Sequence, residues 1–295
     1  MKFLSILAVY TLVVAAHAAD TLIADGAKPE ALGEGYSFTE GPAVDRDGNV
    51  YFTDQPNDRI VKYNAADGSL SDWLKPAGRS NGTFFDDSGN LIACADEKNE
   101  LWSISPDKKV TVLLADFGEK LLNGPNDLWI RPDGNLYFTD PLYARNYWKR
   151  DKAMQQPGQF VYFFDVKSKK ATPVATDLKQ PNGIIGTPDG KTLYVADIGA
   201  KKTYSYSVKP DGTLEDKTLF CEMGSDGMTI DAEGNVYLTG RGVTVFDKTG
   251  KQLTNIPIPE PWTANVTFGG KDRRLLFVTA SKKVYGVKMR VKGAY

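Results

Sequence analysis

The chain has 295 residues, and its 36 lysines and arginines nearly balance its 37 aspartates and glutamates, for a formal net charge of −1. This balance excludes the basic footprint of a nucleic-acid-binding protein. The length allows one large hydrophobic core.

The first 18 residues are predicted to be a secretory signal peptide. Lys2 supplies a positive start, residues 3–16 are apolar, and Ala16-His17-Ala18 matches an A-x-A cleavage pattern. The alternatives are a buried first strand or a membrane anchor, but the apolar run is short for a bilayer span and a polar chain follows at once. We therefore expect a secreted or periplasmic protein with no membrane-spanning segment.

Cleavage of this peptide has a chemical consequence, because His17 is the only histidine in the chain. The mature protein would contain none, which excludes Ser-His-Asp catalysis and histidine-ligated zinc. Catalysis would then depend on other side chains or on a metal bound by oxygen atoms.

Residues 19–295 are expected to form a single domain. The segment 21–24 looks like a strand but has no partner next to it in the sequence. We expect it to pair with residues 283–288, because such a closure removes an exposed sheet edge.

A strand–turn–strand repeat then occurs six times, most clearly at residues 39–54 and 125–140. Each copy opens with an acidic or amide residue, and successive openings are separated by 41, 45, 56, 44 and 39 residues. The six opening residues are Glu40, Asn81, Asn126, Asn182, Asp226 and Asn265. A period near 40 with strand–turn–strand content is typical of a β-propeller in which each repeat forms one blade. We predict an all-β, six-bladed β-propeller with four-stranded antiparallel blades.

The turn inside each repeat should bring two polar positions to the same end of the blade. It folds the two strands back antiparallel, so the opening residue finishes beside the residue fourteen or fifteen positions later. That later residue is an aspartate in four copies, namely Asp54, Asp96, Asp140 and Asp197. The opening residues are expected to point at one axis, with these aspartates in a second ring outside them.

Two of the axial side chains, Glu40 and Asp226, are carboxylates and should repel each other. At ~5 Å and an effective dielectric constant of ~20, this repulsion is roughly 3 kcal/mol. Neighbouring amide oxygens cannot neutralise that charge, whereas a divalent cation can. The pattern therefore predicts a metal ion on the axis, while Asn265 could equally be a structural residue of the pore.

The longest gap between openings holds an insertion at residues 141–159. It leaves the blade directly after Asp140, on the face of the predicted metal, and it contains Tyr143, Arg145 and Tyr147. Long, aromatic-rich connections of this kind suit a lid or pocket wall. The alternative is a solvated surface loop.

Several of these strings together resemble the gluconolactonase–regucalcin (senescence-marker-protein) family. They are Phe38-Thr39-Glu40-Gly41-Pro42, Arg79-Ser80-Asn81-Gly82, Pro125-Asn126-Asp127-Leu128, Pro181-Asn182-Gly183-Ile184 and Ser225-Asp226-Gly227-Met228. The match covers essentially the whole mature chain in the expected order, with Ser225 in place of a proline. The resemblance implies one catalytic divalent metal, usually Ca²⁺, with Zn²⁺, Mg²⁺ or Mn²⁺ as alternatives.

The resemblance also assigns roles to residues. It implies metal ligands at Glu40, Asn126, Asn182 and Asp226. It implies substrate contacts at Arg79, Asn81 and Asn126. Asp197 resembles an acidic position just outside the metal ligands.

The expected chemistry is hydrolysis of a lactone ring. Calcium takes six to eight oxygen ligands, so four side chains leave places for water and substrate. Such an ion polarises a carbonyl oxygen, and an adjacent carboxylate can deprotonate water for attack. The base is Asp226, or else Asp197 or Asp140 through a water. For the outer aspartates the alternative is a hydrogen-bonding role at a strand end.

The leading interpretation is a calcium-dependent lactonase that acts on a small-molecule aldonolactone or similar sugar lactone. One rival is an organophosphatase or arylesterase that uses the same metal site. The other is a non-catalytic propeller binding module with a structural calcium.

Overall fold

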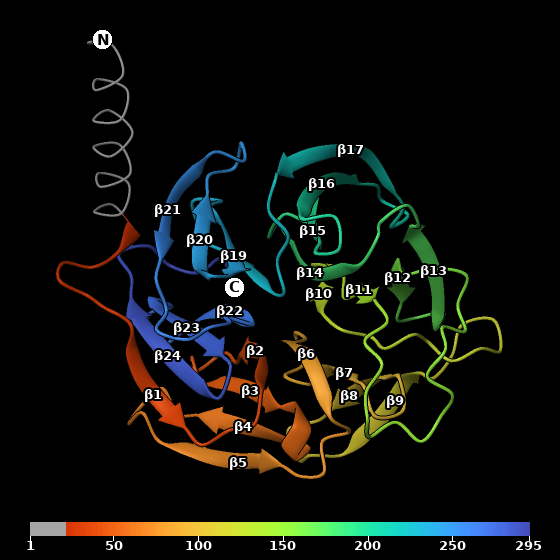
Figure 1. Ribbon diagram of the computed structural model, residues 1–295, viewed down its shortest axis with the longest axis horizontal. Coiled ribbons are helices and arrows are strands. Elements are labelled where there is room, and N and C mark those ends of the chain that lie inside the picture. The colour runs from red at the N-terminus through yellow and green to blue at the C-terminus, as the bar shows by residue number, and fades with distance from the viewer. Residues whose placement is uncertain (1–21) are drawn as a thin grey trace.

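The computed structural model describes residues 22–295, and the predicted signal peptide lies outside the described residues. Its 24 strands form six four-stranded sheets arranged as a ring of blades (Figure 1). The six-bladed propeller predicted from the repeat is therefore confirmed. None of the helices in the described part is long and apolar enough to cross a membrane.

Each blade runs from an inner strand at the axis to an outer strand at the rim, and all strand pairs are antiparallel. The first three blades consist of β2 (Thr39–Val44), β3 (Val50–Asp54), β4 (Arg59–Tyr63) and β5 (Leu70–Leu74); β6 (Ser80–Phe85), β7 (Leu91–Ala95), β8 (Glu100–Ile104) and β9 (Val110–Leu114); and β10 (Leu128–Ile130), β11 (Leu136–Asp140), β12 (Phe160–Asp165) and β13 (Lys170–Ala175). The next two consist of β14 (Pro181–Gly186), β15 (Thr192–Asp197), β16 (Lys202–Val208) and β17 (Leu214–Cys221); and β18 (Met228–Ile230), β19 (Val236–Gly240), β20 (Gly242–Phe246) and β21 (Gln252–Ile256). The last consists of β22 (Asn265–Gly269), β23 (Leu275–Ala280), β24 (Lys283–Lys288) and β1 (Glu30–Glu34), and a short 3₁₀ turn, η1, spans Gln55–Asn57.

The hairpin register places the repeated polar residues at one end of the blades, as predicted. Thr39 pairs with Asp54, and Pro181 pairs with Asp197. The register shifts directly after the opening residue, for example between Glu40 and Ala43. Such a bulge bends the strand and can re-aim a side chain. Here it falls where the inner strand reaches the axis.

The strands that follow the innermost strand of a blade are buried on both faces, because each sheet packs between two neighbouring sheets. Every residue of β3, β7, β11 and β19 is buried. Large apolar side chains from adjacent blades fill the space between sheets, as in the cluster that contains Trp129, Tyr137 and Ile184. This packing makes the ring a rigid frame for the residues at its axis.

The ring closes through β1, but not through the residues expected. Residues 21–24 were predicted to pair with 283–288, whereas the strand that pairs with β24 is β1, with Glu30 opposite Gly286. Ile23 makes only an isolated bridge to Met289. A turn with Gly26 at φ +68° carries the chain away before β1 returns along β24. The predicted closing strand is therefore wrong in its residues.

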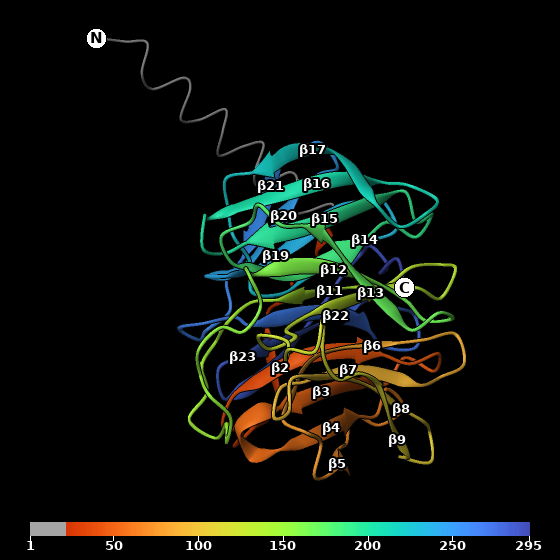
Figure 2. The ribbon, with the colours of Figure 1, turned by 90° about the vertical axis from the view of Figure 1, so that its right-hand side faces the viewer.

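The C-terminal end of the chain lies near the centre of the ring, on the side opposite the strand ends that carry the axial residues (Figures 1 and 2). The hydroxyl of Tyr295 accepts a hydrogen bond from Trp129 Nε1 (2.8 Å) and donates one to the Gly186 carbonyl (2.7 Å). Tyr295 also lines a cavity of about 690 Å³ at this end of the channel. One end of the channel therefore carries the axial acidic and amide side chains, and the other end carries the C-terminal tyrosine and the cavity.

Candidate active site

Glycines next to the opening residues let neighbouring blades meet closely at the axis. A Cβ on Gly41 would lie 1.9 Å from the Asn81 carbonyl, and one on Gly227 would lie 2.0 Å from the Asn265 side chain. The first contact would force the backbones of neighbouring blades apart, and the second would displace the Asn265 side chain from the axis. The small residue after Glu40 and Asp226 is thus a packing requirement, and it brings the opening residues of adjacent blades together.

Asn182 and Asp226 form the centre of the resulting site. Asn182 Nδ2 donates to Asp226 Oδ1 at 2.9 Å and lies 2.9 Å from the Tyr143 hydroxyl. The other carboxylate oxygen of Asp226 accepts from Trp262 Nε1 at 2.7 Å. Both oxygens of this carboxylate are therefore held in fixed directions. Neither Tyr143, named only as part of the insertion, nor Trp262 was predicted as a site residue.

Other oxygen atoms near the axis lack hydrogen-bond donors. Asn81 Oδ1 and Asn182 Oδ1 are buried without a partner, and Glu40 Oε2 accepts from its neighbour Gly41 N at 2.9 Å. None of the ion pairs formed within residues 22–295 involves Glu40 or Asp226. Buried polar groups are normally satisfied, and buried charges are normally paired. Oxygen acceptors with two uncompensated carboxylates are the donor set that a hard cation takes.

This fit depends on amide oxygens as well as carboxylates. In the part of the chain that the structure describes, no three His, Cys, Asp or Glu side chains gather as a metal cluster. Asn126, the remaining predicted ligand, is buried at 5% exposure, and its backbone carbonyl, not its side chain, accepts from Gly82 N at 2.7 Å. The residues present therefore fit a calcium-type site better than a zinc site, because calcium accepts neutral carbonyl oxygens readily.

The two axial carboxyls influence each other's ionisation. Burial raises the pKa of Glu40 well above its usual value, and the neighbouring Asp226 charge raises it further. Burial likewise raises the pKa of Asp226 to about 6, although the Trp262 and Asn182 hydrogen bonds oppose this shift. A cation between them would favour both ionised forms.

Asp127 adds a third carboxyl to the channel, and it was not predicted. It is only 6% exposed, Asn265 Nδ2 lies 3.4 Å from its Oδ2, and burial raises its pKa to about 8. Both residues also line the cavity at the opposite end of the channel. One signal was present in the sequence: four repeats have glycine after the opening residue, where this one has Asp127.

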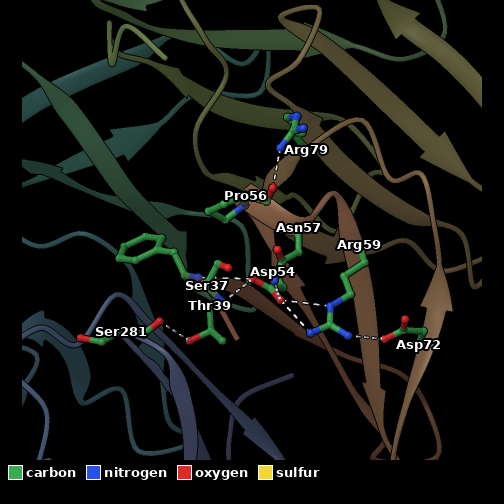
Figure 3. A network of polar contacts seen from close by, with 10 residues as sticks. Ser37, Thr39, Asp54, Pro56, Asn57, Arg59, Asp72, Arg79 and Ser281 are labelled. Carbon is green, nitrogen blue, oxygen red and sulfur yellow. Dashed lines mark hydrogen bonds and ion pairs between the residues drawn. The ribbon is translucent and has the colours of Figure 1, made fainter. Parts of the chain in front are cut away.

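Three of the four outer aspartates hold the segment that leads to an axial residue. Asp54 accepts from Ser37 N (3.0 Å) and Phe38 N (3.3 Å), and it also binds Arg59 (Figure 3). Asp140 accepts in the same way from the N–H groups of residues 123 and 124. Asp197 accepts from those of residues 179, 180 and 200. This saturation favours the hydrogen-bonding role over the role of base for Asp140 and Asp197.

Asp96, the fourth, instead fastens the insertion at residues 141–159. Its Oδ2 accepts from Arg145 Nε at 3.2 Å and from the Tyr147 hydroxyl at 2.5 Å. Its carbonyl accepts from Trp148 Nε1 at 2.8 Å. The insertion therefore packs on the second blade, while its Tyr143 reaches Asn182 in the fourth. These contacts support the interpretation of the insertion as a wall over the site.

Arg79 lies beneath this insertion. Its guanidinium lies 4.5 Å from the centre of the Tyr147 ring and donates to the Pro56 carbonyl at 2.6 Å (Figure 3). Its backbone has φ +47°, a conformation that side-chain-bearing residues rarely adopt, and Asp58 Oδ1 accepts from its N–H at 2.8 Å. A substrate contact of Arg79 stays a prediction.

Taken together, these features define a six-bladed propeller with a candidate site for an oxygen-bound divalent cation at one end of its axis. The chain belongs to the SMP-30/Gluconolactonase/LRE-like family, which matches residues 38–282.

The chain is similar to proteins with different names. A gluconolactonase from Zymomonas mobilis is 27% identical, over 90% of this chain and 82% of the relative. The solved structure of a gluconolactonase from Xanthomonas campestris has a TM-score of 0.83 and 26% identity, over 93% of this chain and 92% of that one. A diisopropyl-fluorophosphatase from Loligo vulgaris is 26% identical, over 72% of this chain and 76% of the relative.

Proposed function

We propose that the protein is a calcium-dependent lactonase that hydrolyses the ring ester of a sugar lactone such as an aldonolactone. The observation that carries the proposal is the set of buried oxygen acceptors on the propeller axis, with two carboxylates that form no ion pair within residues 22–295. Membership of a family whose relatives include gluconolactonases supports the reaction type.

Four side chains are proposed to hold the cation. Glu40 and Asp226 provide charge, while Asn126 and Asn182 provide neutral oxygens. When bound, the ion supplies positive charge that stabilises the developing negative charge on the carbonyl oxygen of the ester. Zn²⁺, Mg²⁺ and Mn²⁺ are the alternatives to Ca²⁺.

Asp226 is proposed as the base that takes a proton from the attacking water. Burial raises its pKa above the usual aspartate value, which makes its carboxylate a better proton acceptor than an exposed one. The hydrogen bonds from Asn182 and Trp262 fix the orientation of its carboxylate. Asp197 is the weaker candidate because it accepts three backbone N–H groups, whereas Asp226 accepts two side-chain donors.

The test is hydrolysis of D-glucono-1,5-lactone, followed by acid release, with enzyme that is untreated, chelated, or chelated and then resupplied with calcium. We expect activity to disappear in chelator and to return with calcium. Unaffected hydrolysis in fully chelated protein would contradict the metal dependence. Calcium binding without hydrolysis of any sugar lactone would favour the non-catalytic binding module.

The similarity to a diisopropyl-fluorophosphatase favours one second candidate, an organophosphatase or arylesterase that uses the same residues. Diisopropyl fluorophosphate and phenyl acetate should therefore be assayed beside the lactone. A specificity constant higher for either than for every sugar lactone tested would support this candidate instead.

We also propose that the protein is exported and cleaved near residue 18. The N-terminal sequence pattern supports this, and the intact mass of the protein recovered from its native host tests it.

A further inference from the structure

Trp262 presents an exposed aromatic surface beside the candidate site. Several large apolar side chains of the described chain are more than a third exposed: Val110, Val112, Met154, Val166, Leu219 and Trp262. Among them, only Trp262 is hydrogen-bonded to an axial residue, through Nε1 to Asp226 Oδ2 at 2.7 Å. The residue is 39% exposed although its N–H group is engaged by Asp226, so the indole is available to a ligand while it stays bound to this carboxylate.

The connection that carries this ring, residues 257–264 between β21 and β22, is held in place. It contains Pro257, Pro259 and Pro261, whose rings restrict the backbone. Three hydrogen bonds fix it: Tyr285 Oη to Glu260 Oε1 (3.0 Å), Ser281 Oγ to the Trp262 carbonyl (3.1 Å) and Thr263 N to the Gly240 carbonyl (3.0 Å). A ligand that contacts the indole therefore meets a surface that is already ordered, which lowers the entropic cost of binding.

A second connection brings polar groups to the same carboxylate. Tyr143 contacts Asn182, the partner of Asp226, and the Arg145 guanidinium lies 5.4 Å from the Tyr143 ring. Arg145 is close enough for its charge to lower the pKa of Asp226. Asp226 thus has an apolar aromatic surface from one connection and hydroxyl and guanidinium groups from another.

A polyhydroxylated ring has the two surfaces that match this arrangement. Its C–H groups carry partial positive charge and pack on the electron-rich face of an aromatic ring. Its hydroxyl groups form hydrogen bonds with tyrosine and arginine. An alkyl lactone would use only the first surface, and an open-chain polyol only the second.

We propose that Trp262 is the platform on which the ring of a polyhydroxylated lactone lies, and that it selects such rings over alkyl lactones. The inference rests on the proposed lactonase function. The alternative role for Trp262 is only to orient Asp226 through its N–H group.

Two substitutions separate these roles. Trp262→Phe keeps an aromatic face but loses the N–H group, whereas Trp262→Leu loses both. With D-glucono-1,5-lactone at saturating calcium, we expect KM to rise by about tenfold in the leucine variant and by less than about threefold in the phenylalanine variant. With δ-valerolactone, the two variants should differ less. Trp73→Phe, on the outer strand β5, is the matched control and should behave as wild type.

Equal KM values for the two Trp262 variants with the sugar lactone would overturn the platform role, whether both rise or neither does. A shared fall in kcat without a KM difference would assign the residue to the orientation of Asp226 alone.

A second measurement does not need turnover. In ¹⁵N-labelled protein the five tryptophans give five indole N–H signals, and Trp262→Phe identifies the one from Trp262. Addition of 1,5-anhydro-D-glucitol, a hydroxylated ring with no ester, should shift that signal and leave the other four in place. Glycerol, an open-chain polyol, should leave it unmoved. No shift with the ring compound at concentrations above the KM for the lactone would overturn the proposal.

The two proposals can fail separately. A shift of the Trp262 signal in a protein that hydrolyses no lactone would leave the ring platform standing and overturn the lactonase function. If the protein hydrolyses lactones and the two Trp262 variants behave alike, the lactonase function stands and the ring platform is overturned.

Discussion

Glu40 and Asp226 are both axial carboxylates, but their hydrogen bonds suit them to different roles. Glu40 accepts from one backbone N–H, whereas Asp226 is oriented by Asn182 on one oxygen and Trp262 on the other. A base must be oriented toward the proton that it takes, while a metal ligand needs chiefly charge and position. This difference makes Asp226 the stronger candidate for the base.

Glu40→Gln and Asp226→Asn should therefore both weaken calcium binding, because each removes one negative charge from the site. At saturating calcium, Glu40→Gln should recover much of its activity, whereas Asp226→Asn should remain slower by about 10²–10⁴-fold, the usual contribution of a general base. Calorimetric titration of calcium and steady-state kinetics measure the two effects separately. Asp197→Asn is the comparison variant: Asp197 holds residues 179 and 180 beside Asn182 but is not a proposed ligand, so calcium affinity should fall less than in Asp226→Asn. If Asp197→Asn is inactive and added calcium restores the activity of Asp226→Asn, the base belongs to the outer ring of aspartates.

Calcium affinity should also depend on pH. Because burial raises the pKa of Asp226 to about 6, protons compete with the cation for this carboxylate below that pH. The affinity should fall by up to about tenfold per pH unit below 6 for the proton on Asp226, and the raised pKa of Glu40 adds a second competing proton at higher pH. Titrations between pH 5 and pH 8 measure this, and Asp226→Asn should flatten the curve. A pH-independent affinity across this range in the wild type would show that Asp226 does not bind the ion.

Strand ends that look equivalent in the sequence perform two different tasks in the structure. Asp54, Asp140 and Asp197 hold backbone N–H groups that lead to an axial residue, whereas Asp96 receives Arg145 and Tyr147 from the insertion. Asp96 is buried at 3% exposure and also accepts from Gln55 Nε2 at 3.2 Å, so its carboxylate depends on these donors. Asp96 fastens the first half of the insertion, while Gln156 Nε2 holds the second half by donating to the carbonyls of residues 117, 120 and 121.

Asp96→Asn should loosen residues 141–159 without changing the metal site. An amide cannot accept from Arg145 as strongly as a carboxylate does, so we expect faster proteolysis within the insertion and a KM several-fold higher. Calcium affinity should stay at the wild-type value because Asp96 contacts no predicted ligand. Limited proteolysis with mass-spectrometric mapping gives the first readout. If calcium affinity falls as much as KM rises, the insertion supports the metal site directly.

The regular parts of the fold could be predicted because the repeat is local. A strand, a turn and a second strand are visible in each copy, and one polar position per copy gives the axial residues. Trp262 and Tyr143 could not be found in this way, since they come from connections that do not recur between blades. Asp127 was visible only as a departure from the glycine found in four other copies.

The prediction of the closing strand was wrong for a different reason. The segment that resembles a strand, 21–24, is diverted by the turn at Gly26, and β1 begins only at Glu30. The register of β1 depends on β24 at the other end of the chain, and local pattern carries no information about such pairing.

At the scale of the whole molecule, removal of the cation should destabilise the propeller. The repulsion between Glu40 and Asp226 acts across the axis, where blades one and five meet the channel. Bound calcium at a hundredfold excess over its dissociation constant adds about 2.7 kcal/mol to the free energy of unfolding. Thermal unfolding with calcium and with chelator measures this as a lower Tm in chelator. Glu40→Gln should show a smaller difference, because one of the repelling charges is gone. An unchanged Tm after confirmed removal of metal would contradict the axial site.

The pairing of β1 with β24 also sets an order in time. Glu30 is made early by the ribosome, and its partner Gly286 is made almost last. Until then, the growing chain can form hairpins and whole blades but not a closed ring, and β1 has no strand to pair with. A chain crossing a membrane through a narrow translocation pore would meet the same constraint, with β1 emerging first and waiting for the final blade. The propeller therefore becomes a single cooperative structure only when synthesis or transport is nearly complete.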